Sequence, residues 1–120
     1  MDVQELYRRI NGDYESAKKI MMMDAIIAKM IVRYPNDQSC AALTSAAEAF
    51  DPKALFEAAH ALKGVTANLG LKEIYSRASA LSEEFREGKP RTMSDDAVRA
   101  MIAEIEQLDQ KAKEEIRAFS

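Results

Sequence analysis

The chain has 120 residues, of which 48% are hydrophobic and 31% are charged, and this suits one domain with a modest core. The formal net charge is -3 and the basic residues form no stripe, which excludes the nucleic-acid-binding class. The single cysteine, Cys40, excludes an internal disulfide and is expected to be a small buried or half-buried residue. No signal peptide and no apolar run of about 20 residues is visible, so we expect a soluble, cytoplasmic protein without membrane contact.

Four glycines and three prolines leave few residues for the turns of an all-β fold, and apolar residues recur at helical spacing. In chain order, we expect helices at 1–10, 13–34, 37–50, 52–69, 71–87 and 95–118. The expected breaks contain glycine or proline and lie at Asn11-Gly12, Pro35, Asp51-Pro52, Gly70 and Gly88-Lys89-Pro90. Asp13 and Asp51 stand at the N-cap positions of the helices that follow them.

The connections between the expected helices are short, so consecutive helices should pack as antiparallel neighbours. The predicted fold class is all-α, with a single domain over residues 1–120. Its architecture is an antiparallel up-down four-helix bundle with a core at about 13–119 and an accessory N-terminal helix. We expect the protein to be a monomer.

The expected long helix 13–34 contains an unusual run, Met21-Met22-Met23. Successive residues of a helix point about 100° apart, so these thioethers cannot converge on one metal ion. We interpret the run as adaptable core filler. The residues expected to face inward in this helix are Ala17, Ile20, Met23, Ile27, Met30, Ile31 and Tyr34.

The helix expected at 52–69 carries the only histidine of the chain, His60. On a helical wheel with about 100° per residue, a continuous apolar arc lies at roughly 140° to 260° from His60. The arc consists of Leu55, Ala58, Ala59, Leu62, Val65, Thr66 and Leu69. His60 therefore points away from the predicted core, which argues against a hydrogen-bonded core histidine.

The neighbours of His60 on this face are unusual for a solvent-facing helix. Glycine inside a helix costs about 1 kcal/mol relative to alanine, so Gly64 suggests that another body approaches closely there. Ala67 lies beside it, and Phe56 places an apolar group where a docking partner can bury it. Lys63 supplies positive charge beside the imidazole, with Lys53 one turn below Phe56. Positive charge suits an anionic adduct of the imidazole and suits a metal ion poorly.

The chemistry follows from the imidazole itself. An exposed imidazole is substantially neutral near pH 7, and a neutral ring nitrogen can attack phosphorus and later act as a leaving group. A residue in mid-helix has no free backbone N–H groups nearby to hold a phosphate. We find no nucleotide-binding loop, metal cage or cofactor site in the sequence. Such a surface is expected to be a carrier whose partner supplies Mg²⁺ and the electrophilic chemistry.

The segment His60-Ala61-Leu62-Lys63-Gly64, followed by Asn68-Leu69-Gly70, resembles the signature of histidine phosphotransfer (HPt) domains. The resemblance extends along most of the chain, through Gly12-Asp13, Pro35 and Phe50-Asp51-Pro52. Two positions depart from the family pattern. Val65 stands where a small or hydroxyl residue is usual, and Ile31-Val32 stands where a phenylalanine is frequent. Val65 lies on the core side, so we expect altered packing and intact chemistry.

The resemblance implies that His60 is the phosphoacceptor, that Lys63 helps to hold the phosphoryl group and that Gly64 admits the partner's active site. The implied partners are receiver domains of response regulators or hybrid histidine kinases, which carry the phosphoryl group on aspartate. The residues expected to contact a receiver are Phe56, Lys53, Glu57 and Ala67. No ATP-binding motif and no receiver pattern is found in the chain. This pattern is expected both of a free-standing shuttle and of a domain cut from a hybrid kinase.

Two alternatives remain open at this point. One is a helical interaction module that binds receivers or a kinase and carries no phosphate. The other is a small enzyme, such as a phosphatase, that uses His60 as a covalent nucleophile. A phosphatase needs a second acid or base, and Glu57, about 60° from His60 on the wheel, is the nearby candidate.

Overall fold

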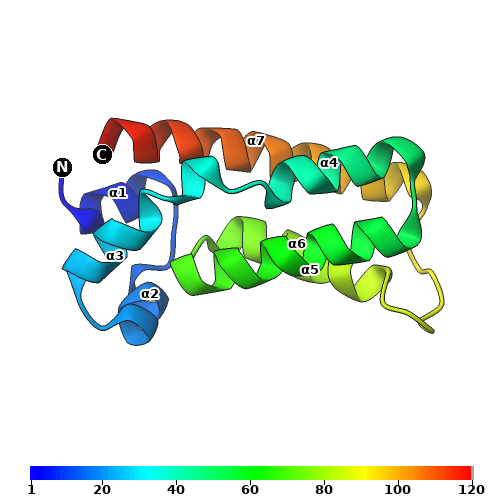
Figure 1. Ribbon diagram of the computed structural model, residues 1–120, viewed down its shortest axis with the longest axis horizontal. Coiled ribbons are helices and arrows are strands. Elements are labelled where there is room, and N and C mark those ends of the chain that lie inside the picture. Colours follow the sequence, from blue (N-terminus) through cyan, green and yellow to red (C-terminus); the bar gives the residue numbers. More distant parts are fainter. Residues whose placement is uncertain (120) are drawn as a thin grey trace.

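All regular structure in the computed structural model, which describes residues 1–119, is helical. The elements are α1 (Val3–Arg9), α2 (Tyr14–Met21), α3 (Asp24–Ile31), the 3₁₀ turn η1 (Tyr34–Asn36), α4 (Ser39–Ala49), α5 (Pro52–Leu69), α6 (Lys72–Glu84) and α7 (Asp95–Phe119). Each connection from α4 to α7 reverses the chain, so these four helices form an up-down bundle (Figure 1). The all-helical prediction is confirmed.

The four bundle helices share one apolar core that all of them line. Its largest fully buried members include Leu43 of α4, Leu55 and Leu62 of α5, Leu81 of α6 and Ile105 of α7. Cys40 is buried in the same core, as predicted. Burial raises the pKa of the Cys40 thiol to about 12, so this residue is an unreactive packing group.

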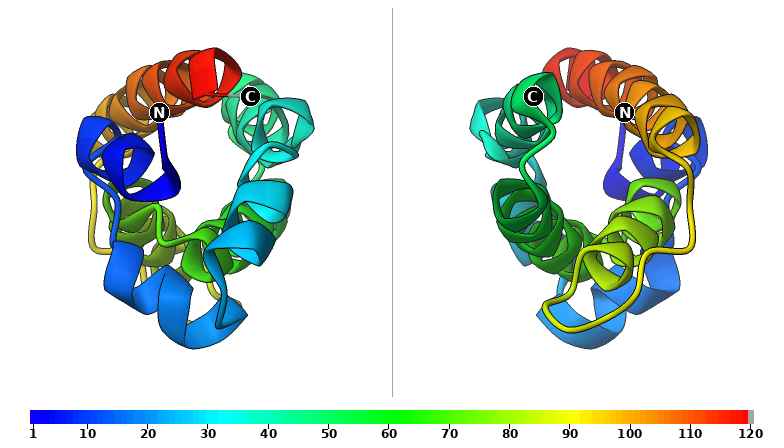
Figure 2. Two further views of the ribbon diagram at one scale, coloured as in Figure 1. Left: turned by 90° about the vertical axis from the view of Figure 1, so that its left-hand side faces the viewer. Right: turned by 90° about the vertical axis from the view of Figure 1, so that its right-hand side faces the viewer.

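A second core cluster lies at the end of the bundle where α1, α2 and α3 are found (Figures 1 and 2). It joins Leu6, Tyr7, Ala17, Ile27 and Ile31 to the ends of the bundle helices. In the end-on views, α2 lies outside the ring of bundle helices, next to α5 and α6 (Figure 2). The three short helices therefore close one end of the bundle and extend its surface on the α5 side.

The prediction of one long helix at 13–34 is wrong. The chain leaves helical geometry at Met22, whose φ of 73° is positive, and α3 begins at Asp24. Asp24 accepts hydrogen bonds from Tyr14 and, at 2.9 Å, from the Lys18 ammonium, which holds α3 against α2. The expected bundle core at 13–119 is corrected accordingly, because the four helices of the bundle begin at Ser39, and α2 and α3 pack at one end of it.

The same break overturns the prediction for several apolar side chains. Ala17, Ile27, Ile31 and Tyr34 are buried as expected. In contrast, Ile20, Met23 and Met30 were expected to face inward and are exposed, and within the methionine run only Met21 packs against the core. The interpretation of Met22 and Met23 as core filler is wrong.

Gly70 connects the two regions of the fold. It ends α5 with a φ of +69°, and a Cβ at this position would lie 2.5 Å from the carbonyl oxygen of Asp13. Its own carbonyl accepts a 2.7 Å hydrogen bond from the Asp13 N–H. Glycine is therefore required both by the backbone conformation and by the close approach of the start of α2.

Candidate functional site

The helix that carries the candidate site, α5, has the predicted boundaries, Pro52 to Leu69. Pro52 occupies the first turn, where its missing N–H costs no hydrogen bond. Asp51 stands at the N-cap position in extended conformation, but its side chain makes no capping hydrogen bond. The Thr66 hydroxyl donates to the Leu62 carbonyl at 2.7 Å, which satisfies a polar group on the buried face. Local signals thus place eighteen residues in one uninterrupted helix.

The two faces of α5 divide as the helical wheel predicts. Leu55, Ala58, Ala59, Leu62, Thr66 and Leu69 are buried, and Val65 is half-buried between the two core clusters. His60 is exposed on the opposite face. The imidazole therefore stands in water on a helix whose other side is fixed by the core.

Phe56 lies one turn before His60, and its ring stacks on the imidazole. The ring centroids are 5.5 Å apart and the planes differ by 14°. Stacking of this kind restricts the orientation of an otherwise mobile exposed ring and contributes about 0.5–1.5 kcal/mol beyond area burial. Phe56, expected to be a docking residue, is thus also in direct contact with the candidate nucleophile.

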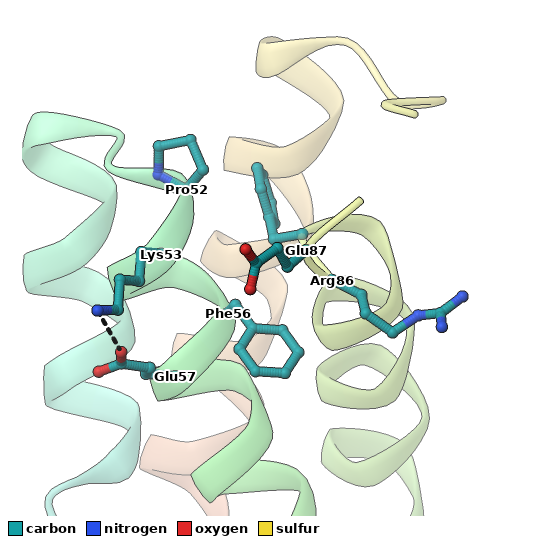
Figure 3. Close-up of a pocket in the computed structure, with 7 residues that line it drawn as sticks. Pro52, Lys53, Phe56, Glu57, Arg86 and Glu87 are labelled. Atoms are coloured by element: carbon teal, nitrogen blue, oxygen red, sulfur yellow. Dashed lines mark ion pairs between the residues drawn. The ribbon is translucent and has the colours of Figure 1, made fainter. Parts of the chain in front are cut away.

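Phe56 is shared with a cavity of about 580 Å³ between the start of α5 and the end of α6 (Figure 3). Pro52, Phe56 and Phe85 supply apolar surface, whereas Arg86 and Glu87 bring charge from the α6 end. The Phe56 ring extends from α5 toward Arg86 (Figure 3). The sequence reasoning missed Phe85, Arg86 and Glu87, because helix periodicity does not tell which neighbouring helix lies beside the His60 face.

Gly64 leaves open space one turn after His60. A Cβ built there meets no heavy atom within 4 Å, so nothing in the described part of the fold requires glycine at this position. The side chain of Lys63 is half-buried and forms no ion pair within residues 1–119. Ala67 is half-buried on the same side of the helix. The ammonium of Lys63 and the open space at Gly64 and Ala67 therefore flank the imidazole.

The two remaining expected contact residues neutralise each other. The Lys53 ammonium lies 4.0 Å from a Glu57 carboxylate oxygen, and both side chains are well exposed (Figure 3). Within the described residues, Glu57 therefore pairs with Lys53 and forms no hydrogen bond with His60. Among residues 1–119, no group of three or more histidine, cysteine or acidic side chains is arranged to hold a metal ion.

A family model for the Hpt domain matches residues 36–111 of the chain, which include the whole of α4, α5 and α6 and most of α7. The chain belongs to the Hpt domain family. Hpt domains are histidine-containing phosphocarrier modules of two-component signalling that interact with receiver domains and kinases, and are not catalysts in themselves. No curated protein and no solved structure matches the chain.

In this Hpt domain, the predicted site residues lie together on one face of α5, with His60, Phe56, Lys63, Gly64 and Ala67 within three turns. The matched residues begin at position 36, so α1, α2 and α3 lie outside the family match. Within the described residues, no helix has the length and apolarity that crossing a membrane requires.

Proposed function

We propose that this Hpt domain is a phosphorelay carrier that accepts a phosphoryl group on His60 from a receiver-domain aspartate and passes it to another receiver. One observation carries the proposal. The only histidine of the chain is exposed on the side of α5 that the core does not use, beside the open space at Gly64. A receiver's active site can reach this imidazole without displacing any side chain of the bundle.

The transfer step needs only a nucleophile from this chain. A neutral ring nitrogen of His60 attacks the phosphorus of the aspartyl phosphate, and an N–P bond forms as the O–P bond breaks. The aspartate leaves as a carboxylate, and the proton on the other ring nitrogen balances part of the new charge or passes to water. In the second transfer, a carboxylate of the next receiver attacks the phosphorus, an O–P bond forms as the N–P bond breaks, and the neutral imidazole of His60 is regenerated. Mg²⁺ for both steps is expected to be held by the receiver's own carboxylates.

The residues around His60 have distinct roles in this proposal. Phe56 limits the orientations of the imidazole, so that fewer non-productive conformations compete with in-line attack. Lys63 places an unpaired ammonium next to the phosphoryl oxygens. Gly64 keeps free the volume into which the receiver's aspartate enters. The N–P bond then persists until a second receiver arrives, because the site lacks a group that activates water.

The phosphatase alternative has little support from the geometry. Its required acid or base, Glu57, is exposed and lies against Lys53. A carboxylate that faces lysine on the open surface is poorly placed to take a proton from water at phosphorus. The interaction-module alternative does not explain why glycine stands at position 64, since docking alone does not require access to the imidazole.

Transfer from phosphorylated receivers tests the proposal. Receiver domains encoded in the same genome are phosphorylated in the presence of Mg²⁺ and mixed with the wild type or with His60→Gln. We expect phosphate that is acid-labile and base-stable on the wild type, and none on the variant. Because His60 is exposed, circular dichroism and unfolding should show the same fold for both proteins.

Four outcomes contradict the proposal. Absence of transfer to the wild type from every receiver in the panel excludes the carrier role. Equal labelling of His60→Gln places the phosphate elsewhere. Equal signalling in cells by wild type and His60→Gln favours the interaction module. Release of inorganic phosphate by the protein alone, without a receiver, favours the phosphatase.

A further inference from the structure

The cavity between the start of α5 and the end of α6 has the size and lining of a small-molecule site. Its volume of about 580 Å³ lies within the roughly 300–1,000 Å³ that such sites occupy. Pro52, Phe56 and Phe85 give it apolar walls, and four charged side chains complete the lining. A cavity of this kind takes a ligand with an apolar body, and the charges decide which polar group that ligand carries.

Three of the four charged side chains already have a partner. Lys53 lies 4.0 Å from Glu57, and the Arg86 guanidinium binds Glu83, which is outside the cavity lining, at 2.9 Å. Glu87 is exposed and forms no ion pair within residues 1–119. Its carboxylate points toward α5, whereas the Arg86 guanidinium points away from the cavity (Figure 3). The charge that remains for a ligand is therefore negative.

The same end of the bundle shows that its phenylalanine rings accept cations. The Arg91 guanidinium lies 4.6 Å from the centroid of the Phe85 ring, and the Arg99 guanidinium lies 4.6 Å from that of Phe50. The face of an aromatic ring is electron-rich and attracts a cation within about 6 Å of its centroid. Phe56 borders the cavity beside Phe85, so a cationic ligand there meets a ring of the same kind.

We infer that this cavity is a binding site for a small organic cation with an apolar body, an amidinium or ammonium ion that carries an aryl or alkyl group. The Glu87 carboxylate accepts hydrogen bonds from the cation, and Phe56 and Phe85 contact the apolar part. An anion would face Glu87 without a free cation to balance it, since Lys53 and Arg86 are each paired. A neutral ligand would leave the charge-assisted hydrogen bond unmade.

Phe56 connects this site to His60. Its ring stacks on the imidazole, with centroids 5.5 Å apart, and also lines the cavity. A ligand packed against Phe56 restricts the motion of that ring and, through the stack, the orientations of the imidazole. Occupancy of the cavity therefore favours imidazole conformations that are suited to in-line attack. The cation site goes beyond the proposed function and does not depend on it, whereas this effect on His60 rests on it.

The probe for the test is benzamidine, which joins a planar cation to a phenyl ring. Benzamide, its neutral isostere, is the matched control ligand. Titrations are followed by the NMR signals of Phe56 and Phe85, which should shift and saturate with benzamidine. We expect benzamide to bind about three- to five-fold more weakly, the difference that one partly exposed charge pair makes.

Two substitutions locate the probe. Glu87→Gln removes the carboxylate charge, so it should weaken benzamidine about three- to five-fold and leave benzamide unchanged. The matched control is Glu106→Gln, which alters an exposed glutamate of α7 outside the cavity lining and should bind benzamidine as the wild type does. Both positions are exposed, so unfolding should show the same stability for both variants.

Three results overturn the inference. Shifts that rise linearly with benzamidine, without saturation, mean that the contact is nonspecific. Equal affinities for benzamidine and benzamide mean that the cavity is apolar space without selectivity for charge. Equal weakening by Glu87→Gln and Glu106→Gln means that the net charge of the protein attracts the probe and the cavity does not.

Labelling of His60 by phosphoramidate, a small phosphoryl donor, tests the connection through Phe56. Saturating benzamidine should raise the labelling rate of the wild type about two-fold and leave that of Phe56→Leu, which lacks the ring stack, unchanged. An unchanged wild-type rate overturns the connection and leaves the cation site in place. Absence of transfer from every receiver would sink the carrier role without altering the titrations, so the two proposals fail separately.

Discussion

At one end of the bundle, the connection from α6 to α7 folds back over the buried carboxylate of Glu84. At the other end, α1, α2 and α3 lie across the ends of α5 and α7 (Figure 1). Glu84 accepts hydrogen bonds from the backbone N–H groups of Thr92 and Met93, both at 2.8 Å, and from the Arg91 guanidinium at 2.9 Å. The same guanidinium lies 4.6 Å from the centroid of the Phe85 ring. Polar contacts and stacking therefore close this end and cover its aromatic residues.

The α1–α3 end is closed by apolar packing and a few hydrogen bonds. The Tyr7 hydroxyl donates to the Leu69 carbonyl at 2.6 Å, which satisfies a carbonyl at the end of α5. Yet this end leaves Met22 and Met23 in water. The comparison shows that the chain is able to close a bundle end without exposing large apolar side chains. Exposure at the α2–α3 junction is thus a property of that junction and not a general consequence of the fold.

The largest stability effect is expected at the Glu84 end. Glu84→Gln removes the charge shared by the guanidinium of Arg91, the backbone N–H groups of Thr92 and Met93 and the Thr92 hydroxyl, which donates at 2.6 Å. It also turns an amide toward the backbone N–H groups, so we expect a loss of about 3 kcal/mol in the free energy of unfolding. Urea denaturation measures it. The neighbouring Glu83→Gln, which breaks only an exposed pair with Arg86, should change stability by less than about 0.5 kcal/mol. If the two substitutions lowered stability equally, the hydrogen bonds to the buried Glu84 carboxylate would not be what stabilises this end of the bundle.

The same carboxylate predicts how stability depends on pH. Burial raises the pKa of Glu84, but hydrogen bonds from Thr92, Met93 and Arg91 outweigh it and lower the pKa from 4.5 to about 2. A folded-state pKa below the unfolded value gives stability that is complete above about pH 5 and is lost as the pH falls toward 2. We expect the difference in unfolding free energy between wild type and Glu84→Gln to shrink over this range. A constant difference would mean that Glu84 titrates normally.

At the opposite end, Tyr7→Phe tests the contact with α5. Removal of the hydroxyl leaves the Leu69 carbonyl buried without its partner, and we expect a loss of about 1–2 kcal/mol in the unfolding free energy. Tyr75→Phe is the control, because the Tyr75 side chain is only half-buried and its hydroxyl forms no hydrogen bond within residues 1–119. A loss from Tyr7→Phe no larger than that of the control would show that packing alone holds α1 in place.

Between the two ends, Gly64→Ala separates stability from transfer. The added Cβ meets open space and removes a glycine from mid-helix, so the free energy of unfolding should rise by about 1 kcal/mol. Transfer from a receiver should slow, and Gly64→Leu should slow it further. Ala61→Gly, one turn earlier, should lower stability without slowing transfer. If Gly64→Ala is stabilised and transfers normally, the open space does not admit the partner.

The smallest effect is expected at the strained turn. Met22→Gly places glycine at a positive φ and should raise the free energy of unfolding by about 0.5 kcal/mol, the relieved strain less the added freedom of the unfolded chain. Met21→Gly, still within helix α2, should lower it by about 1 kcal/mol. Thermal unfolding distinguishes the two variants, because the midpoint temperature should rise for Met22→Gly and fall for Met21→Gly. A loss of stability in Met22→Gly would mean that the turn carries no strain.

The success of prediction differs between the two regions for a physical reason. The boundaries of α5 follow from Asp51-Pro52 and Gly70, and its exposed face follows from the spacing of its apolar residues. Each of these signals lies within the helix itself. The break at Met22 has no such local signal, because the run 13–34 contains neither glycine nor proline before Pro35. The break is stabilised by the hydrogen bonds from Tyr14 and Lys18 to Asp24. These bonds form only after the chain has bent, so the sequence pattern does not predict them.

The sequence by itself determined that the protein is helical, that α5 spans residues 52–69 and that His60 stands opposite the core, because caps, breaks and 3.6-residue periodicity act over a few residues. Only the tertiary structure decided that Phe56 stacks on His60, that the end of α6 lies beside it and that α2 and α3 present methionines to solvent. These features depend on groups distant in the chain, whose meeting is set by how the helices pack.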